Sequence, residues 1–248
     1  MIVENIKNLK KQFKKDVTLV AVSKTIDIET IKIAVENGID ILGENKVQEA
    51  HEKFLEIQKF IQELEVKAKI YGNVKNLENY KNLKWHLIGH LQTNKVKKAI
   101  EFADLIHSVD SVSLLQSINK HSRQIGKTQN ILIQVNTSGE ESKFGMDEKS
   151  VVELFVLIVK HEDEYCSNVQ ILGLMTMAPL TDNETEIREC FGKAKVLFDR
   201  LKLDYFGYSF LDMKYLSMGM SHDFGLAIDE GANMVRIGSA IFGERKCF

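Results

Sequence analysis

Residues 18–42, TLVAVSKTIDIETIKIAVENGIDIL, contain the pattern that decides the fold. The apolar run that begins at Leu19 is typical of a buried strand, and the residues after Asp27 have the character of a helix that this aspartate can cap. Gly38 is placed to end that helix, and a second apolar run follows directly at 39–42. A strand, a helix and a second strand in this order predict two parallel neighbours in an α/β sheet.

The same alternation continues to the end of the chain. Apolar strand-like runs lie at residues 18–23, 39–42, 84–88, 104–109, 130–135, 169–174, 214–218 and 233–237. Helical patterns lie at residues 2–13, 28–37, 46–65, 94–102, 111–124, 147–161, 184–201 and 222–230. Eight strand–helix units preceded by one additional N-terminal helix predict a (β/α)8 barrel of the TIM type. An open doubly wound sheet is the alternative.

The chain is expected to form a single domain over residues 1–248, because no linker rich in proline or serine divides it. The polar stretch 66–82 is only weakly periodic and predicts the end of a helix followed by a surface loop.

Composition narrows the class of protein. The formal net charge is -2, with both signs mixed, so we expect no nucleic-acid partner. The first residues are charged throughout, and no apolar run is long enough to span a bilayer, which predicts a cytoplasmic protein without a membrane partner. Three cysteines at uneven spacing favour neither a disulfide framework nor a zinc site. A monomer is expected.

In a barrel of this type the active site lies at the carboxyl ends of the strands. The segments SMGMS (217–221) and IGSAIFG (237–243) follow the seventh and eighth predicted strands. Small residues let backbone N–H groups approach an anion, and loops at these two strands commonly bind phosphate. Taken singly, Gly238 and Ser239 would only make a turn and a cap, but two such loops together favour a phosphate site.

Lys24 follows the first predicted strand and therefore lies at the same end of the barrel. A lysine at a barrel rim commonly extends its ammonium into water. Partial desolvation would instead favour the neutral, nucleophilic amine, which forms a Schiff base with a carbonyl. Beside a phosphate site, this chemistry suits either a sugar-phosphate aldolase or a protein that holds pyridoxal 5'-phosphate (PLP), and the pattern leaves both open.

Six motifs carry a resemblance to a known family. They are VAVSKT (20–25), GENKVQEA (43–50), WHLIGHLQTNK (85–95), HSVDS (107–111), GLMTMAP (173–179) and LSMGMSHDFGLAIDEGANMVRIGSAIFGER (216–245). With these motifs the chain resembles the YggS/PROSC family of PLP-binding proteins, whose barrel is related to the N-terminal domain of alanine racemase. The match extends from the first strand nearly to the C-terminus.

The resemblance implies a cofactor, PLP, and a set of residues around it. Lys24 matches the lysine that forms the aldimine with PLP, and Arg236 matches the arginine beside the pyridine nitrogen. The phosphate-binding positions correspond to Ser221, Gly238 and Ser239, with Met220 offering its backbone. The remaining positions lining the pocket correspond to Asn45, His86 and Met175.

The resemblance also implies a role in intracellular PLP homeostasis, without an evident catalytic reaction. The related racemases take a second base, a tyrosine, from a C-terminal domain that this sequence, ending at Phe248, is expected to lack. Tyr205, Tyr208 and Tyr215 are expected to be packing residues. Apo PLP-dependent enzymes are the expected partners, and an amino-acid racemase or another fold-type III PLP enzyme is the alternative.

A metal site is not expected. His86 and His90 are four residues apart, but they lie in a strand-like run interrupted by Gly89, and no carboxylate motif accompanies them.

Overall fold

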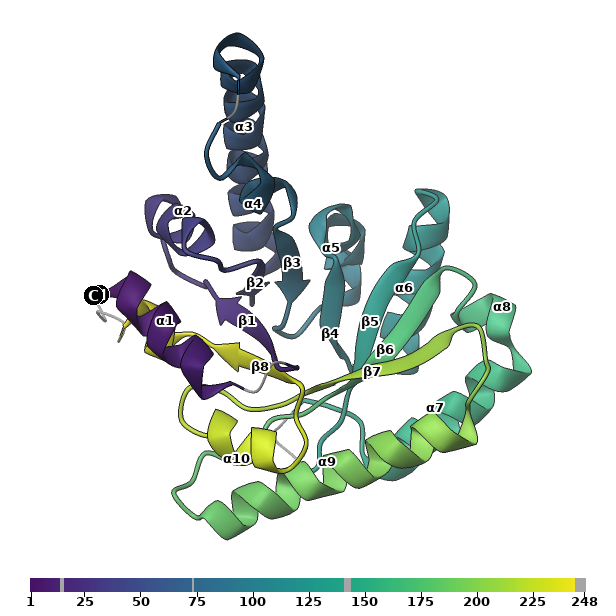
Figure 1. Ribbon diagram of the computed structural model, residues 1–248. Coiled ribbons are helices and arrows are strands. Elements are labelled where there is room, and N and C mark those ends of the chain that lie inside the picture. The colour runs from purple at the N-terminus through teal and green to yellow at the C-terminus, as the bar shows by residue number, and fades with distance from the viewer. Residues whose placement is uncertain (14–15, 73, 141–143, 244–248) are drawn as a thin grey trace.

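A closed ring of eight parallel strands forms the centre of the molecule in a computed structural model of the chain (Figure 1). The structure describes residues 1–13, 16–72, 74–140 and 144–243. Neighbours along the sequence are neighbours in the ring, and the last strand pairs with the first to close it. The predicted (β/α)8 barrel is confirmed, and the alternative of an open sheet is wrong.

The elements follow the predicted order. The strands are β1 Thr18–Val22, β2 Ile41–Glu44, β3 Lys84–Leu87, β4 Leu105–Val109, β5 Gln129–Gln134, β6 Val169–Met175, β7 Leu211–Ser217 and β8 Met234–Ile237. The helices up to β5 are α1 Ile2–Gln12, α2 Ile28–Glu36, α3 Val47–Tyr71, α4 Leu77–Lys81, the 3-10 helix η1 Thr93–Lys95, α5 Val96–Phe102 and α6 Val112–Gln124. The later helices are α7 Glu148–Lys160, α8 Glu162–Tyr165, α9 Glu184–Asp204, α10 Phe224–Asp229 and α11 Ser239–Phe242.

The first strand–helix unit forms as its residues predict. Asp27 caps α2, because its Oδ1 accepts a hydrogen bond of 2.8 Å from the backbone N–H of Thr30. Gly38, with a φ of 89°, follows the end of the helix in a conformation that favours glycine. The additional N-terminal helix α1 contacts the last helix, since Asn5 Nδ2 donates to Ile241 O at 3.0 Å.

The stretch 66–82 is more helical than predicted. α3 continues to Tyr71 and ends at Gly72, and α4 then turns back beside α3, which extends well beyond the ring of strands (Figure 1). The rings of Phe60 and Tyr80 join the two helices with centroids 5.2 Å apart. The weak periodicity was misleading because α4 is held by its contacts with α3 and α2, and a short polar stretch carries no signal of such contacts.

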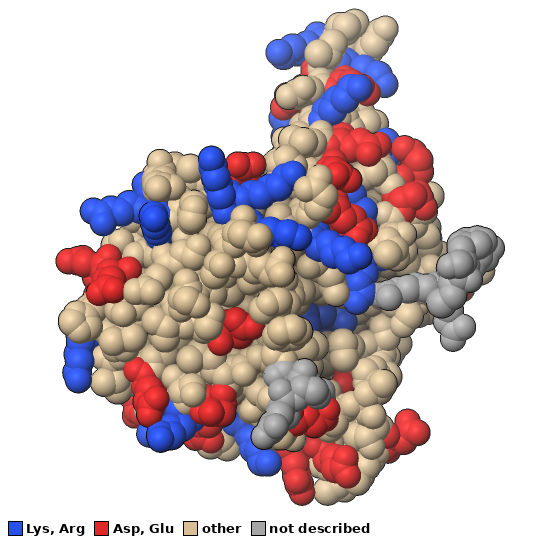
Figure 2. Space-filling model, turned by 180° about the vertical axis from the view of Figure 1, so that it is seen from behind, with Lys and Arg blue, Asp and Glu red and all other residues tan. Residues whose placement is uncertain are grey.

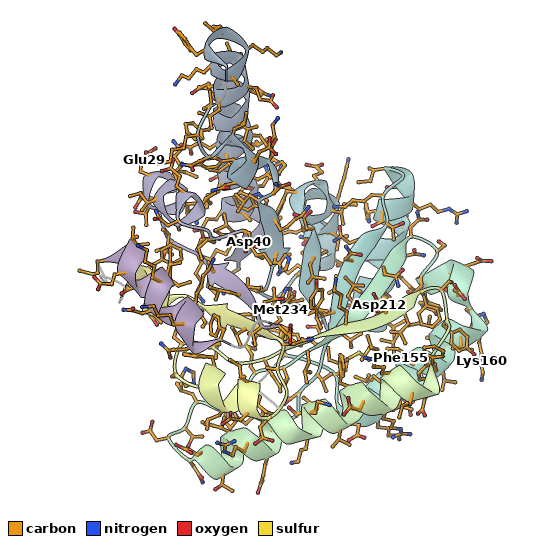
Figure 3. All side chains as sticks on the ribbon, in the orientation of Figure 1. Glu29, Asp40, Phe155, Lys160, Asp212 and Met234 are labelled. Carbon is orange, nitrogen blue, oxygen red and sulfur yellow. The ribbon has the colours of Figure 1, made fainter. Side chains whose placement is uncertain are left out.

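The interior of the barrel has an apolar layer and a polar layer. Val20, Leu105, Leu132, Met175 and Met234 form a small cluster of their own, separate from the large core that also includes the surrounding helices. Met234 lies among the strands (Figure 3). Side chains alternate between the two faces of a strand, so Arg236, two residues after Met234, faces the interior one layer nearer the carboxyl ends.

The outer surface carries charges of both signs. Lys and Arg gather in a band across the upper half of the face in Figure 2, and Asp and Glu dominate its lower edge. Within the described ranges, the structure contains no helix whose length and apolar character would let it cross a membrane. The described residues also contain no group of three His, Cys, Asp or Glu side chains that could hold a metal ion.

Candidate functional site

A cavity of about 420 Å³ opens at the carboxyl ends of β1, β7 and β8. Its walls are Val22, Lys24, Ile26, Met220, Ser221, His222, Arg236, Gly238, Ser239 and Gly243. Six of the nine predicted site residues are among them. This volume falls within the range of small-molecule sites, about 300–1,000 Å³.

The Ser221 hydroxyl accepts hydrogen bonds from backbone N–H groups on one side of the cavity. Its Oγ accepts from the backbone N–H of Gly238 at 3.3 Å and from that of Ala240 at 3.5 Å. Two backbone donors at the start of α11 and one hydroxyl therefore converge on one point, which is the arrangement that binds phosphate oxygens.

The backbone N–H of Met220 donates to Asp223 Oδ1 at 2.5 Å, and Asp223 is almost completely buried. The predicted contact of the Met220 backbone with a phosphate remains a prediction. The preceding Gly219 has a φ of +93°, and a Cβ there would lie 2.6 Å from Ala227 Cβ and 2.9 Å from Phe224 Cα. The turn is therefore made by a glycine and an aspartate, and it directs Ser221 toward the cavity.

Replacing Gly219 by alanine is expected to destabilise the protein by about 1–3 kcal/mol, because the methyl group overlaps α10 and the positive φ is strained. Thermal unfolding measures the effect. Gly225→Ala in α10 is the matched control, since its Cβ would meet no described atom within 4 Å. The control should be neutral or stabilising by up to about 1 kcal/mol. Equal loss of stability in both variants would contradict this account of the turn.

Arg236 supplies a buried positive charge to the cavity wall. Its Nη1 donates to Ser217 Oγ at 2.7 Å and its Nη2 to Thr176 O at 2.9 Å. Burial lowers the pKa of the guanidinium to about 10, and Asp223 opposes that shift. The group therefore remains protonated at neutral pH and acts only as a donor.

Lys24 lies in the turn after β1, and a buried ion network stabilises this turn. Lys53 Nζ donates to Ser23 O at 2.7 Å, to Glu44 Oε1 at 2.9 Å and to Glu49 Oε1 at 2.7 Å. Glu49 Oε1 also accepts from the backbone N–H of Thr25 at 2.5 Å. Both neighbours of Lys24 are thereby tied to the same ammonium–carboxylate group.

The turn after β1 needs this support because Thr25 has a φ of 65°, which is unfavourable for a β-branched residue. Ser23 adds a further bond, from its Oγ to Glu44 Oε1 at 2.7 Å. Burial raises the pKa of the Glu44 carboxyl, and the Lys53 ammonium opposes that rise. Glu44 is fully buried, and its Oε2 has no hydrogen-bond partner in the described part of the chain.

Three predicted site residues do not line the cavity. Met175 belongs to the inner apolar cluster, and His86 is buried inside the barrel. Asn45 lies just beyond the end of β2, where its backbone approaches Gly89 so closely that a Cβ at 89 would be 2.4 Å from Asn45 O. Their predicted contact with a cofactor remains a prediction.

Other residues that shape the site were not predicted. Ser217 and Thr176 hold Arg236, and Glu44 with Lys53 holds the turn of Lys24. Glu44 ends an apolar strand with a charge, which was the one signal available in the sequence. Lys53 lies in a helix rich in charged residues, where a buried lysine is not distinguishable from a solvated one.

The sequence and the fold have counterparts among known proteins. A family model described as the alanine racemase N-terminal domain matches residues 1–246, so the protein is of the class built on that barrel. A relative in Aquifex aeolicus, named pyridoxal phosphate homeostasis protein, is 39% identical over 228 residues, which are 92% of this chain and 87% of the relative. A human protein of the same name is 34% identical over 236 residues, covering 92% of this chain and 76% of its own length.

The chain belongs to the family of pyridoxal phosphate homeostasis proteins. Among solved structures, PipY of Synechococcus elongatus PCC7942 without PLP is 32% identical, with a TM-score of 0.82 over 98% of this chain and 100% of that one. The same protein with PLP bound superposes with a TM-score of 0.79. An alanine racemase of Clostridium difficile 630 has a TM-score of 0.69 at 16% identity, covering 99% of this chain and 60% of that chain, and shares the fold.

Proposed function

We propose that this protein binds PLP in the cavity at the carboxyl ends of β1, β7 and β8 and takes part in intracellular PLP homeostasis without catalysing a reaction of its own. The observation that carries the proposal is the pairing, in one cavity, of an amine with converging phosphate donors. The relative PipY, whose solved structures include one with PLP bound, supports the choice of ligand.

The residues present fit the cofactor. Ser221, Gly238 and Ser239 would hold the phosphate, because the donors of this region already converge on the Ser221 hydroxyl. Lys24 would hold the aldehyde end, and Arg236 would face the ring nitrogen. A cavity of about 420 Å³ is large enough for a molecule of this size.

The finer proposal is a covalent aldimine on Lys24. Lys24 Nζ, in its neutral form, would hold the aldehyde carbon of PLP through a carbon–nitrogen double bond, with the aldehyde oxygen released as water. Addition of water would release the aldehyde again. Lys24 is half-buried at the rim of the cavity, so both directions have access to solvent.

Arg236 favours binding of PLP over catalysis of a reaction on a bound amino acid. An arginine that remains protonated only donates hydrogen bonds, so a pyridine nitrogen placed beside it would accept one and would carry no proton of its own. An unprotonated ring withdraws electrons weakly from a bound amino acid. Tyr205, Tyr208 and Tyr215 are not among the described residues that line the cavity, and Tyr205 packs on Phe155 with ring centroids 5.0 Å apart.

The absorbance spectrum of the purified protein with PLP, before and after borohydride, tests the proposal. We expect a visible band that collapses on reduction, with the pyridoxyl group on the peptide containing Lys24. A colourless protein that also fails to take up added PLP would overturn it. Exchange of an amino acid's α-proton that depends on Lys24 would instead favour the racemase alternative.

Delivery of PLP to apo-enzymes is the second part of the proposal. It predicts that an apo PLP-dependent enzyme gains activity faster from the loaded protein than from the same concentration of free PLP, and equal rates would contradict it.

The proposal also includes the state of the protein, which is a monomer that acts in the cytoplasm as one domain over residues 1–248.

A further inference from the structure

A chain of hydrogen bonds runs behind the cavity through the interior of the barrel. Arg236 Nη1 lies 2.7 Å from Ser217 Oγ, which lies 3.1 Å from His107 Nδ1, and His107 Nε2 lies 3.0 Å from His86 Nδ1. The four residues come from β8, β7, β4 and β3, and all are buried. Only Arg236 among them lines the cavity.

The direction of these hydrogen bonds follows from the arginine. Because a guanidinium only donates, Ser217 Oγ accepts from Arg236, and its own proton needs an acceptor. Within the described residues, His107 Nδ1 is the only other hydrogen-bond partner of Ser217 Oγ. A proton on His107 Nδ1 would leave the serine proton buried without an acceptor, which is unfavourable.

The same reasoning continues to the next ring. With Nδ1 of His107 accepting, the proton of the neutral ring lies on Nε2, which donates to His86 Nδ1. His86 then carries its own proton on Nε2. Burial lowers the pKa of His86 to about 3. Burial, with a smaller contribution from the Arg236 guanidinium, lowers the pKa of His107, so both rings are neutral at physiological pH.

We propose that Ser217 and His107 are positioning residues which hold the Arg236 guanidinium in the cavity wall, and that the chain is polarised from Arg236 to His86 with both histidines in the Nε2–H form. The part concerning PLP rests on the proposed function. The prediction of the histidine tautomers does not rest on it, because it concerns the protein without ligand.

Nitrogen-15 NMR of the histidine side chains tests the polarity in the wild-type protein without PLP. We expect both His86 and His107 to show a protonated Nε2 and an unprotonated Nδ1 from pH 6 to pH 8. An Nδ1–H tautomer at His107, or a charged ring at either position, would overturn the proposed direction. This test is independent of whether PLP binds.

Ser217→Ala tests the positioning role. In the loaded protein we expect a shifted visible absorption maximum and about fivefold to tenfold weaker PLP binding, because the guanidinium loses an anchor. Ser217→Thr keeps the hydroxyl and should return the spectrum to that of the wild type. Ser122→Ala is the matched control, since Ser122 is equally buried but lies in α6 outside the ring of strands.

A double-variant cycle separates a chain from independent packing effects. His107→Leu should shift the spectrum in the same direction as Ser217→Ala, and the double variant should be no worse than Ser217→Ala alone. Additive effects, or a folded Ser217→Ala with wild-type spectrum and affinity, would overturn the positioning role. Failure of the wild type to bind PLP would refute the proposed function and leave the polarity to the NMR measurement.

Discussion

Replacing Lys24 by alanine is expected to abolish the visible absorption band and the borohydride-stable pyridoxyl adduct. The reason is that the proposed covalent bond has no other amine among the described residues that line the cavity. PLP binding should weaken at least about 100-fold, which corresponds to about 2.7 kcal/mol, while the phosphate site at Ser221 and Gly238 retains part of the affinity. Titration followed by absorbance and by equilibrium dialysis measures both quantities.

Lys127→Ala is the matched control for this variant. Lys127 is also half-buried. Burial lowers the pKa of its ammonium group. Its Nζ donates to Ile100 O and Ala103 O, each at 2.7 Å, close to the start of β5 and therefore at the opposite end of the barrel. The control should keep the band, the adduct and the affinity. An adduct that persists in Lys24→Ala, or disappears in Lys127→Ala, would contradict the assignment of Lys24.

Replacing Lys53 by methionine is expected to give the largest loss of stability, about 3–5 kcal/mol, because it leaves the fully buried Glu44 without its positive partner. For a chain of this size, that loss lowers the Tm by roughly 10 °C. The turn of Lys24 also loses the bond from Lys53 to Ser23 O, so PLP binding should weaken at temperatures where the variant is still folded. Calorimetry and PLP titration measure the two effects.

The loss in Lys53→Met is expected to be greater at pH 8 than at pH 5. Burial already raises the pKa of Glu44 above its ordinary value of 4.5, and removing the opposing Lys53 raises it further. A carboxyl whose pKa is raised in the folded state contributes stability at low pH, and that stability is lost as pH rises through the folded-state pKa. The unfolding free energy of the variant should therefore fall with pH across this window.

Two controls keep this prediction specific. The double variant Glu44→Gln/Lys53→Met removes both charges, so it should recover part of the stability and lose most of the added pH dependence. Lys149→Met breaks an exposed pair with Glu153 in α7 and should change stability by less than about 1 kcal/mol. A Lys53→Met variant as stable as Lys149→Met would show that the buried network contributes little.

Local pattern was sufficient for most of the fold. The apolar runs and their spacing predicted all eight strands, and Asp27 and Gly38 marked the limits of α2 correctly. The stretch 66–82 was predicted poorly, because α4 is stabilised by contacts with α3 such as Phe60 with Tyr80. Such contacts between helices leave no periodic signal in a short polar stretch.

For the site, the sequence by itself determined which residues follow β1, β7 and β8, and six of the nine predicted residues line the cavity because a closed barrel brings strand ends together. Only the tertiary structure decided that His107 lies between His86 and Ser217, although Ser217 is 110 positions from His107 in the sequence. The tertiary structure also decided that Lys53 binds Ser23 O, next to Lys24. Hydrophobic periodicity is a local property that reports which face of a strand is buried. Partners across the barrel depend on the register of all eight strands and on its closure, which no local pattern contains.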